Sequence, residues 1–182
     1  MPGYPLFLAA CYKVFGITPQ LAVAVQLVIA ACMPVQILFL MRSIGHALGL
    51  ADHVIGRLSI IVAVLATVHF GALLFSGLLM TDMLFTMLFL FFLQLLVIAW
   101  HASSWRLMLC TGLVLGACNV VRPLIFFPMC IAILIFFLTS GFWQKRAFLT
   151  ASFLCGWAIV IAIWLVRNWL LTGLWFLYMV SV

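Results

Sequence analysis

Long apolar runs separated by short polar breaks dominate this sequence. Most runs approach the roughly 20 residues that a helix needs to cross the hydrocarbon core of a bilayer. The runs expected to cross are residues 20–41, 58–75, 83–100, 107–121, 124–139 and 147–166. The pattern therefore predicts an all-α protein, a polytopic transmembrane helix bundle of about six spans.

Both ends of the chain are apolar but do not have the pattern of a span. Residues 1–19 are interrupted by Pro2, Pro5 and Pro19 and contain a lone Lys13, which favours a helix lying at the lipid headgroups. The segment after Arg167 carries the interfacial aromatics Trp169, Trp175 and Tyr178. We therefore expect interfacial helices at both ends.

The polar breaks set the expected loops and ends. Residues 42–57 form the longest break, 101–106 a short loop and 140–146 a basic turn, and the last span is expected to stop at Arg167-Asn168. The fourth run, 107–121, is short for a crossing. It contains Gly112, Gly116 and Asn119, so it is expected to pack tightly against other helices rather than face lipid.

Composition agrees with the pattern. The chain is 70% hydrophobic and 5% charged with a mean hydropathy of +1.46, which excludes a soluble domain because ordinary domains are about 25% charged. The net charge of +6 does not indicate nucleic acid, since the eight Lys and Arg are scattered between apolar runs and form no basic face. No repeat or long linker divides the chain, so residues 1–182 are expected to form a single transmembrane domain.

The cations predict an orientation. With the 42–57 break in the cytoplasm, the cytoplasmic ends hold more cations than the outer face, as the positive-inside rule requires. The inner set is Arg42, Arg57, Arg106, Lys145 and Arg146, and the outer set is Lys13, Arg122 and Arg167. Asp82 then shares the outer face.

Asp82 is one of only two acidic residues, and it lies at a turn between two apolar runs. Ionisable groups at membrane depth are costly, which makes Asp82 the leading candidate for a functional carboxylate. The plain alternative is a helix N-cap, with Thr81 or Asp82 accepting a hydrogen bond from the first backbone N–H groups of the next helix. The sequence leaves both interpretations open.

Arg122 and Arg167 end different helices on the face expected for Asp82. Guanidinium forks fit phosphate oxygens, so these charges together indicate a phosphate-binding pocket. The alternative for each Arg is an ordinary cation at a helix C-terminus. His69, in the outer half of the second span, is either a proton carrier for this pocket or a histidine bonded to a neighbouring helix.

No metal site is predicted. The six cysteines, at 11, 32, 110, 118, 130 and 155, show no ligand spacing and are expected to be small packing residues. His46 and His53 fit no metal spacing either.

Four stretches in order resemble the membrane glycosyltransferases of the GT-C fold, in the bacterial branch similar to dolichyl-phosphate-mannose protein mannosyltransferases and lipid A aminoarabinose transferases. They are Pro2-Gly3-Tyr4-Pro5 with the residues to 9, residues 76–86, residues 112–123 ending in Arg122-Pro123, and Arg167-Asn168-Trp169. Each motif is short, and the resemblance depends on their order and on the number of spans between them.

The resemblance implies transfer of a sugar from a polyprenyl-phosphate donor to a lipid, glycan or protein acceptor, usually with inversion. The reaction takes place on the outer face of the bacterial cytoplasmic membrane. Asp82 is then the catalytic carboxylate, with Arg122, Arg167, Tyr4 and His69 binding substrate. No organic cofactor is implied, and the need for a divalent metal is left open.

The chain also departs from this family. Members carry a further helix and an acidic outer loop before the Pro-Gly-Tyr-Pro motif, and they continue beyond the Arg-Asn motif. We therefore expect the sequence to be part of a longer enzyme.

Two other classes of protein fit the same residues. A transporter or flippase-like protein would use the buried charges to move an ion or a lipid. A non-catalytic membrane subunit would use its polar residues for helix packing alone.

Overall fold

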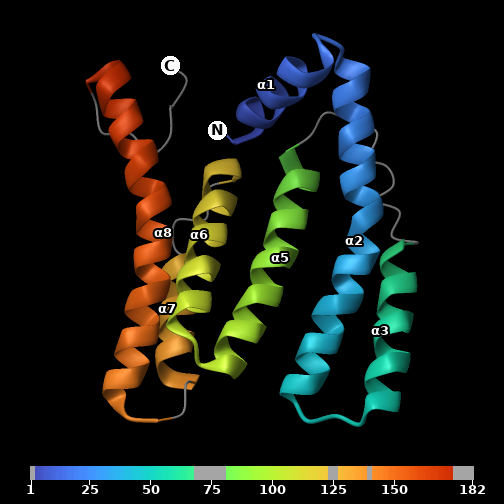
Figure 1. The fold of residues 1–182 in the computed structure, drawn as a ribbon, viewed down its shortest axis with the longest axis vertical. Helices are drawn as coiled ribbons and strands as arrows, with labels where there is room; N and C mark the ends of the chain where they lie inside the picture. Colours follow the sequence, from blue (N-terminus) through green and yellow to red (C-terminus); the bar gives the residue numbers. More distant parts are fainter. Residues whose placement is uncertain (1–2, 68–80, 123–126, 139–140, 174–182) are drawn as a thin grey trace. The chain divides into compact units, whose positions relative to one another are not determined.

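The computed structural model describes residues 3–67, 81–122, 127–138 and 141–173. Over these ranges the chain forms seven α-helices and no strand, which confirms the all-α prediction (Figure 1). The helices are α1 (Gly3–Phe15), α2 (Pro19–Ala47), α3 (Asp52–Thr67), α5 (Thr81–Ala102), α6 (Trp105–Val121), α7 (Phe127–Leu138) and α8 (Trp143–Thr172).

Three of these helices are long and apolar enough to cross a membrane. They contain the segments Pro19–Ala47, Asp82–Ala102 and Trp143–Leu171, with mean hydropathies of 2.3, 2.4 and 2.2 over their most apolar windows. The helices α6 and α7 are apolar but shorter, and the second predicted span continues beyond the end of α3 into residues outside the described ranges. The described residues thus support a membrane protein with three candidate spans, and the prediction of six spans is not confirmed.

Four predicted boundaries were wrong. The 101–106 loop and the 140–146 turn are mostly helical, because α5 ends at Ala102, α6 begins at Trp105 and α8 begins at Trp143. Most of the 42–57 break is helical, because α2 continues to Ala47 and α3 begins at Asp52, leaving a tight connection in which Gly49 has φ 67°. The helix α8 does not stop at Arg167-Asn168 but continues to Thr172, where Gly173 in the left-handed conformation caps it. Charged side chains mark where an apolar run meets the headgroups, whereas a glycine with positive φ ends the helix.

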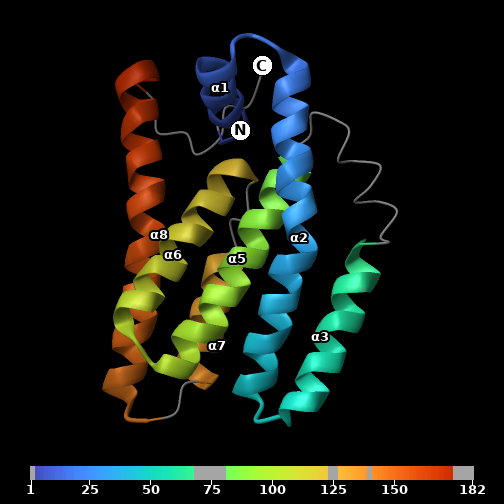
Figure 2. The same ribbon diagram turned by 45° about the vertical axis from the view of Figure 1, so that its right-hand side comes forward.

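Residue contacts group the chain into two compact units, residues 4–97 and residues 98–182 together with residues 1–3. In the first unit α2 and α3 lie side by side in both ribbon views (Figures 1 and 2). Gly45 permits this approach, because a Cβ there would lie 2.7 Å from Ile55 Cγ1. The Gln36 side-chain amide donates a hydrogen bond to Gln94 Oε1, which ties α2 to α5.

In the second unit α6 packs mainly on α8. The prediction for residues 107–121 is confirmed, because Gly112, Gly116 and Asn119 are all buried. This face of α6 is therefore turned to protein rather than to lipid.

The α6–α8 contact is a seam of glycines from both helices. A Cβ on Gly112 would collide with the Phe153 carbonyl oxygen, and one on Gly156 would collide with the Leu109 carbonyl oxygen. Since glycine lacks this atom, the two backbones touch directly, as small residues permit between membrane helices. The helices are parallel, with the first half of α6 beside the middle of α8 (Figure 1).

Candidate functional site

Asp82 lies in the first turn of α5 and is half-buried. The helix already includes Thr81, so both residues that the sequence offered as N-caps belong to the helix itself. The Thr86 hydroxyl donates to the Asp82 carbonyl oxygen at 2.7 Å, within the same helix. The positive end of the helix dipole attracts negative charge, so the first turn of α5 is a favourable place for a carboxylate.

Tyr4, a predicted substrate-binding residue, lies on α1 with its hydroxyl buried. Burial raises the pKa of its phenol, and the interaction with the Gln26 side chain on α2 opposes that rise more weakly. Gln26 is itself only 1% exposed, so α1 and α2 meet through a buried polar pair. A buried phenol that stays neutral can orient a substrate by hydrogen bonding without adding charge.

The bond between Gln36 and Gln94 fixes which levels of α2 and α5 face each other. The two helices run in the same direction in both ribbon views (Figures 1 and 2), and they rise equally per residue. Asp82 precedes Gln94 by twelve residues, and residue 24 precedes Gln36 by the same number. Asp82 is therefore level with residue 24 on α2. Asp82 therefore lies within about one helical turn of the level of Gln26, which contacts Tyr4.

Arg167 lies in the last two turns of α8 and is exposed, but it is held in place by its neighbours. Its Cζ lies 4.6 Å from the centroid of the Trp164 ring, a cation–π arrangement one turn back on the helix. One guanidinium nitrogen donates to Asn168 Oδ1 at 3.4 Å. Since a guanidinium has five N–H donors in a planar fork, these contacts orient the group and leave it able to bind a phosphate.

Arg122 follows the end of α6 in extended conformation, with φ −143°, and its side chain is exposed. Because Gly112 lies beside residues 153–157, the position ten residues further along α6 is level with residues 163–167 of α8. Arg122 and Arg167 thus lie at the same end of this unit and at a similar level.

Two buried amides accompany these cations. Asn119 is 2% exposed in the last turn of α6, and Asn168 is 7% exposed beside Arg167. Both residues make polar or ring interactions within the protein. The end of the unit formed by α6 and α8 is therefore polar, although the helices leading to it are apolar.

Three of the predicted site residues, Tyr4, Asp82 and His69, are not placed in this cluster. Asp82 belongs to the unit of residues 4–97, and Arg122 and Arg167 belong to the other, so the meeting of all three charges stays a prediction. His69 lies outside the described residues.

Metal-ligating groups do not gather in the described residues, where no set of three His, Cys, Asp or Glu side chains is placed to hold an ion. All six cysteines are free thiols. The His46 Nδ1 and Asp52 Oδ1 atoms are 4.0 Å apart, an exposed pair that contributes little to stability.

The amides of Gln26 and Asn168 were not among the predicted site residues, although Asn168 lies in one of the four motifs. The available signal was an amide in an otherwise apolar helix, which is costly unless it is bonded within protein. Which partner each amide would find depends on contacts between distant helices, and the local pattern does not contain that information.

No family model, curated protein or solved structure matches the chain. The fold and the composition define its class as an α-helical membrane protein.

Proposed function

We propose that this chain is a membrane glycosyltransferase, or part of one, that moves a sugar from a polyprenyl-phosphate donor to a lipid, glycan or protein acceptor. The reaction inverts the anomeric carbon and takes place on the outer face of a bacterial cytoplasmic membrane. The proposal builds on the order of the four sequence motifs and on the residues that gather at the helix ends.

The observation that carries the proposal is the polar end of the α6–α8 pair. Two guanidiniums, Arg122 and Arg167, lie there at a similar level, and the amides of Asn119 and Asn168 are buried beside them. No acidic residue occurs in residues 98–182, so the charged side chains at this end of the unit are all cations. The phosphate of a lipid-linked donor complements these cations, because guanidinium groups fit phosphate oxygens.

The proposed chemistry has two parts, binding of the phosphate and transfer of a proton. Arg122 and Arg167 hold the phosphate that departs with the prenyl chain and stabilise its growing negative charge. Asp82 accepts the proton of the acceptor hydroxyl as that oxygen attacks the anomeric carbon. Tyr4 and Gln26, at the level of Asp82, orient the acceptor by hydrogen bonds. The proposal requires that the start of α5 and the ends of α6 and α8 lie on the same side of the membrane.

The test is sugar transfer by the full chain in membranes, supplied with a panel of polyprenyl-phosphate hexoses and pentoses and with product measured by mass spectrometry. Asp82→Asn is expected to slow transfer about 10²- to 10⁴-fold, the usual contribution of a general base. Asp52→Asn is the matched control, because Asp52 is the other carboxylate and its side chain is 93% exposed. It should transfer sugar at the wild-type rate.

Arg122→Gln and Arg167→Gln are expected to raise the KM for the donor more than that for the acceptor, because they bind the phosphate of the donor alone. Wild-type rates in Asp82→Asn, or no transfer from any donor by the wild-type chain, would refute the proposal.

A further inference from the structure

The opposite end of the α6–α8 pair carries a second group of cations, mixed with exposed aromatic rings. We name it the basic–aromatic rim, and it consists of Trp105 and Arg106 at the start of α6 and Phe142, Trp143, Lys145 and Arg146 at the start of α8. These residues take no part in the proposed sugar transfer, since Arg122 and Arg167 lie at the other ends of the same helices.

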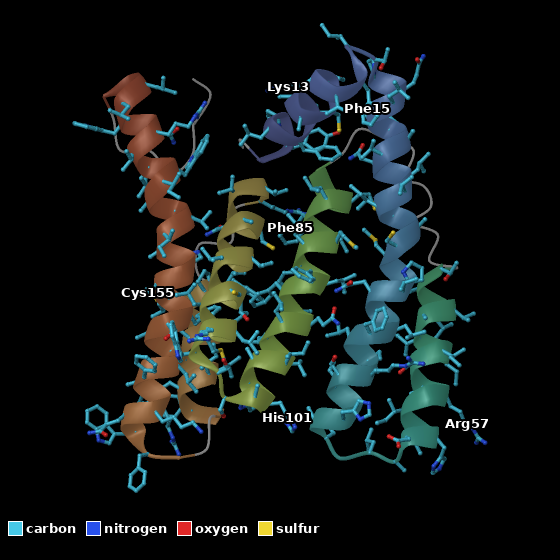
Figure 3. All side chains as sticks on the ribbon, in the orientation of Figure 1. Lys13, Phe15, Arg57, Phe85, His101 and Cys155 are labelled. Atoms are coloured by element: carbon cyan, nitrogen blue, oxygen red, sulfur yellow. The ribbon has the colours of Figure 1, made fainter. Side chains whose placement is uncertain are left out.

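Contacts between the two helices bring the parts of this rim together. The rings of Trp105 and Phe148 are 6.3 Å apart, so the start of α6 lies one turn or less from the Lys145-Arg146 pair. Figure 3 shows His101, in the last turn of α5, at the end of the unit where α6 and α8 begin. The cations of the rim therefore share one end of the unit.

The aromatic rings are exposed to an unusual degree. Phe142 is 86% exposed and Trp143 is 69% exposed, although both are large and apolar. Tryptophan and phenylalanine beside Lys and Arg are typical of the boundary between hydrocarbon and headgroups, where the ring is buried in lipid and the cation reaches the phosphate layer.

Two cations of the rim are oriented by contacts within the protein. Arg146 Nε donates to the Gly141 carbonyl oxygen at 3.0 Å, and Arg106 Cζ lies 5.5 Å from the centroid of the Trp105 ring. Neither contact neutralises a positive charge. The anion that does so must come from outside the unit, because residues 98–182 contain no Asp or Glu.

The helix polarity adds to this excess of positive charge. Neither α6 nor α8 has an acidic residue in its first turn, and neither has a side-chain N-cap. A cation near the N-terminus of a helix is repelled by the positive end of the helix dipole, whereas a cation near the C-terminus is attracted by the negative end. A bound anion would offset both the charge of the cations in the rim and the positive ends of the two helix dipoles.

The length of α8 sets the depth of the rim. Between Arg146 and Arg167 the helix carries no charged residue, and this interval spans about 32 Å at 1.5 Å per residue. The hydrocarbon core of a bilayer is about 30 Å thick. When Arg167 lies in one headgroup layer, Lys145 and Arg146 lie in the other.

We propose that the basic–aromatic rim is a binding site for the anionic phospholipid headgroups of the membrane leaflet that it faces. Arg106, Lys145 and Arg146 bind the lipid phosphate, and Trp105, Phe142 and Trp143 lie among the adjoining acyl chains. The charge imbalance of the unit, the exposed rings and the depth of the rim each favour this partner.

The test measures the thermal unfolding of the purified full chain in a neutral detergent as phosphatidylglycerol or phosphatidylcholine is added. Phosphatidylglycerol should raise the unfolding temperature at a lower lipid fraction than phosphatidylcholine does. The double variant Lys145→Gln/Arg146→Gln should need about 25-fold more phosphatidylglycerol for half of the effect, since each cation that binds the lipid phosphate directly contributes about fivefold.

The matched control is Arg42→Gln/Arg57→Gln, which removes two exposed cations from the other unit and should shift the half-effect by less than about threefold. Equal losses in the two double variants would overturn the proposal, because the effect would then be general attraction. Two results on the wild-type chain would also overturn it, even if a variant fails to fold. These are equal effects of the two lipids, and equal stabilisation by inorganic phosphate at the same concentration.

Discussion

At the residue scale, the contacts of Arg167 show how a cation at a membrane boundary can be preorganised for binding an anion. Trp164 lies under its guanidinium and Asn168 accepts one of its hydrogen bonds, so the planar fork is oriented before any ligand arrives. A preorganised fork loses less entropy on binding a phosphate than a flexible ammonium does. The same arrangement stabilises the end of α8. A single cation such as Arg167 can therefore stabilise the end of a helix and also bind a ligand.

Tyr4 gives a prediction on pH. Burial raises the pKa of its phenol above the ordinary value of 10.0, so the folded chain keeps the phenol neutral where the unfolded chain begins to ionise it. The contribution of Tyr4 to stability is therefore fully present below pH 10 and is lost as the pH rises through the folded-state value. Tyr4→Phe should remove this loss.

The measurement is the absorbance of tyrosinate at 295 nm in the wild-type chain minus that in Tyr4→Phe, both in detergent. The difference should titrate with a midpoint above 10.0. A midpoint at or below that value would contradict the burial of the phenol.

At the element scale, the glycine seam decides how α6 and α8 pack. Gly156→Ala should destabilise the chain by about 1–3 kcal/mol, because the new Cβ meets a backbone carbonyl oxygen, which cannot rotate away. Gly56→Ala on α3 is the matched control. No atom lies within 4 Å of its added Cβ, so it should be neutral or stabilising by up to about 1 kcal/mol.

Both variants can be compared with wild type by thermal unfolding in detergent. The interpretation of the seam fails if Gly156→Ala unfolds at the wild-type temperature. It also fails if Gly56→Ala is destabilised as much as Gly156→Ala.

The positions of the helices were predicted better from the sequence than their packing partners or the residues at which they end. The apolar runs located α2, α5 and α8, and Gly112 and Gly116 correctly marked a face of α6 that packs on protein. Gly156, which completes the seam from α8, was not identified, because its partner is distant in the sequence and the local pattern carries no such information. Helix ends were misplaced where polar residues were taken as breaks, although such residues continue a helix readily.

The candidate site was predictable to a similar extent. The charges of Asp82, Arg122 and Arg167 stand out because charge is rare in this chain. The buried amides Gln26 and Asn168 were not predicted as site residues, because an amide in an apolar helix is as often a packing residue as part of a site.

At the scale of the whole molecule, charge is distributed unevenly along the chain. Both carboxylates precede residue 98, and five of the eight Lys and Arg follow it. The second half is therefore purely cationic, and its charges lie near the two ends of its helices. This distribution fits a protein whose anionic partners are the bilayer itself and a lipid-linked substrate.

This view predicts that α8 crosses the membrane. Its 30 residues extend about 45 Å, enough to span the hydrocarbon core and reach both headgroup layers. Single cysteines introduced at Gln144 and at Leu171, both exposed, should react with an impermeant maleimide from opposite sides when the native cysteines are replaced by Ala.

Cys155 provides the internal control. It is exposed on α8 between these two positions, so as the only cysteine it should be shielded by lipid from the impermeant reagent (Figure 3). Labelling of both introduced cysteines from the same side would show that the helix does not cross.

The hydrogen bond between the Gln36 and Gln94 side chains, which joins α2 to α5, is insensitive to pH. Neither Gln36 nor Gln94 gains or loses a proton at any physiological acidity, and neither side chain carries net charge. The changes in pH that accompany a gain or loss of proton-motive force therefore do not alter the charge of either partner in this hydrogen bond.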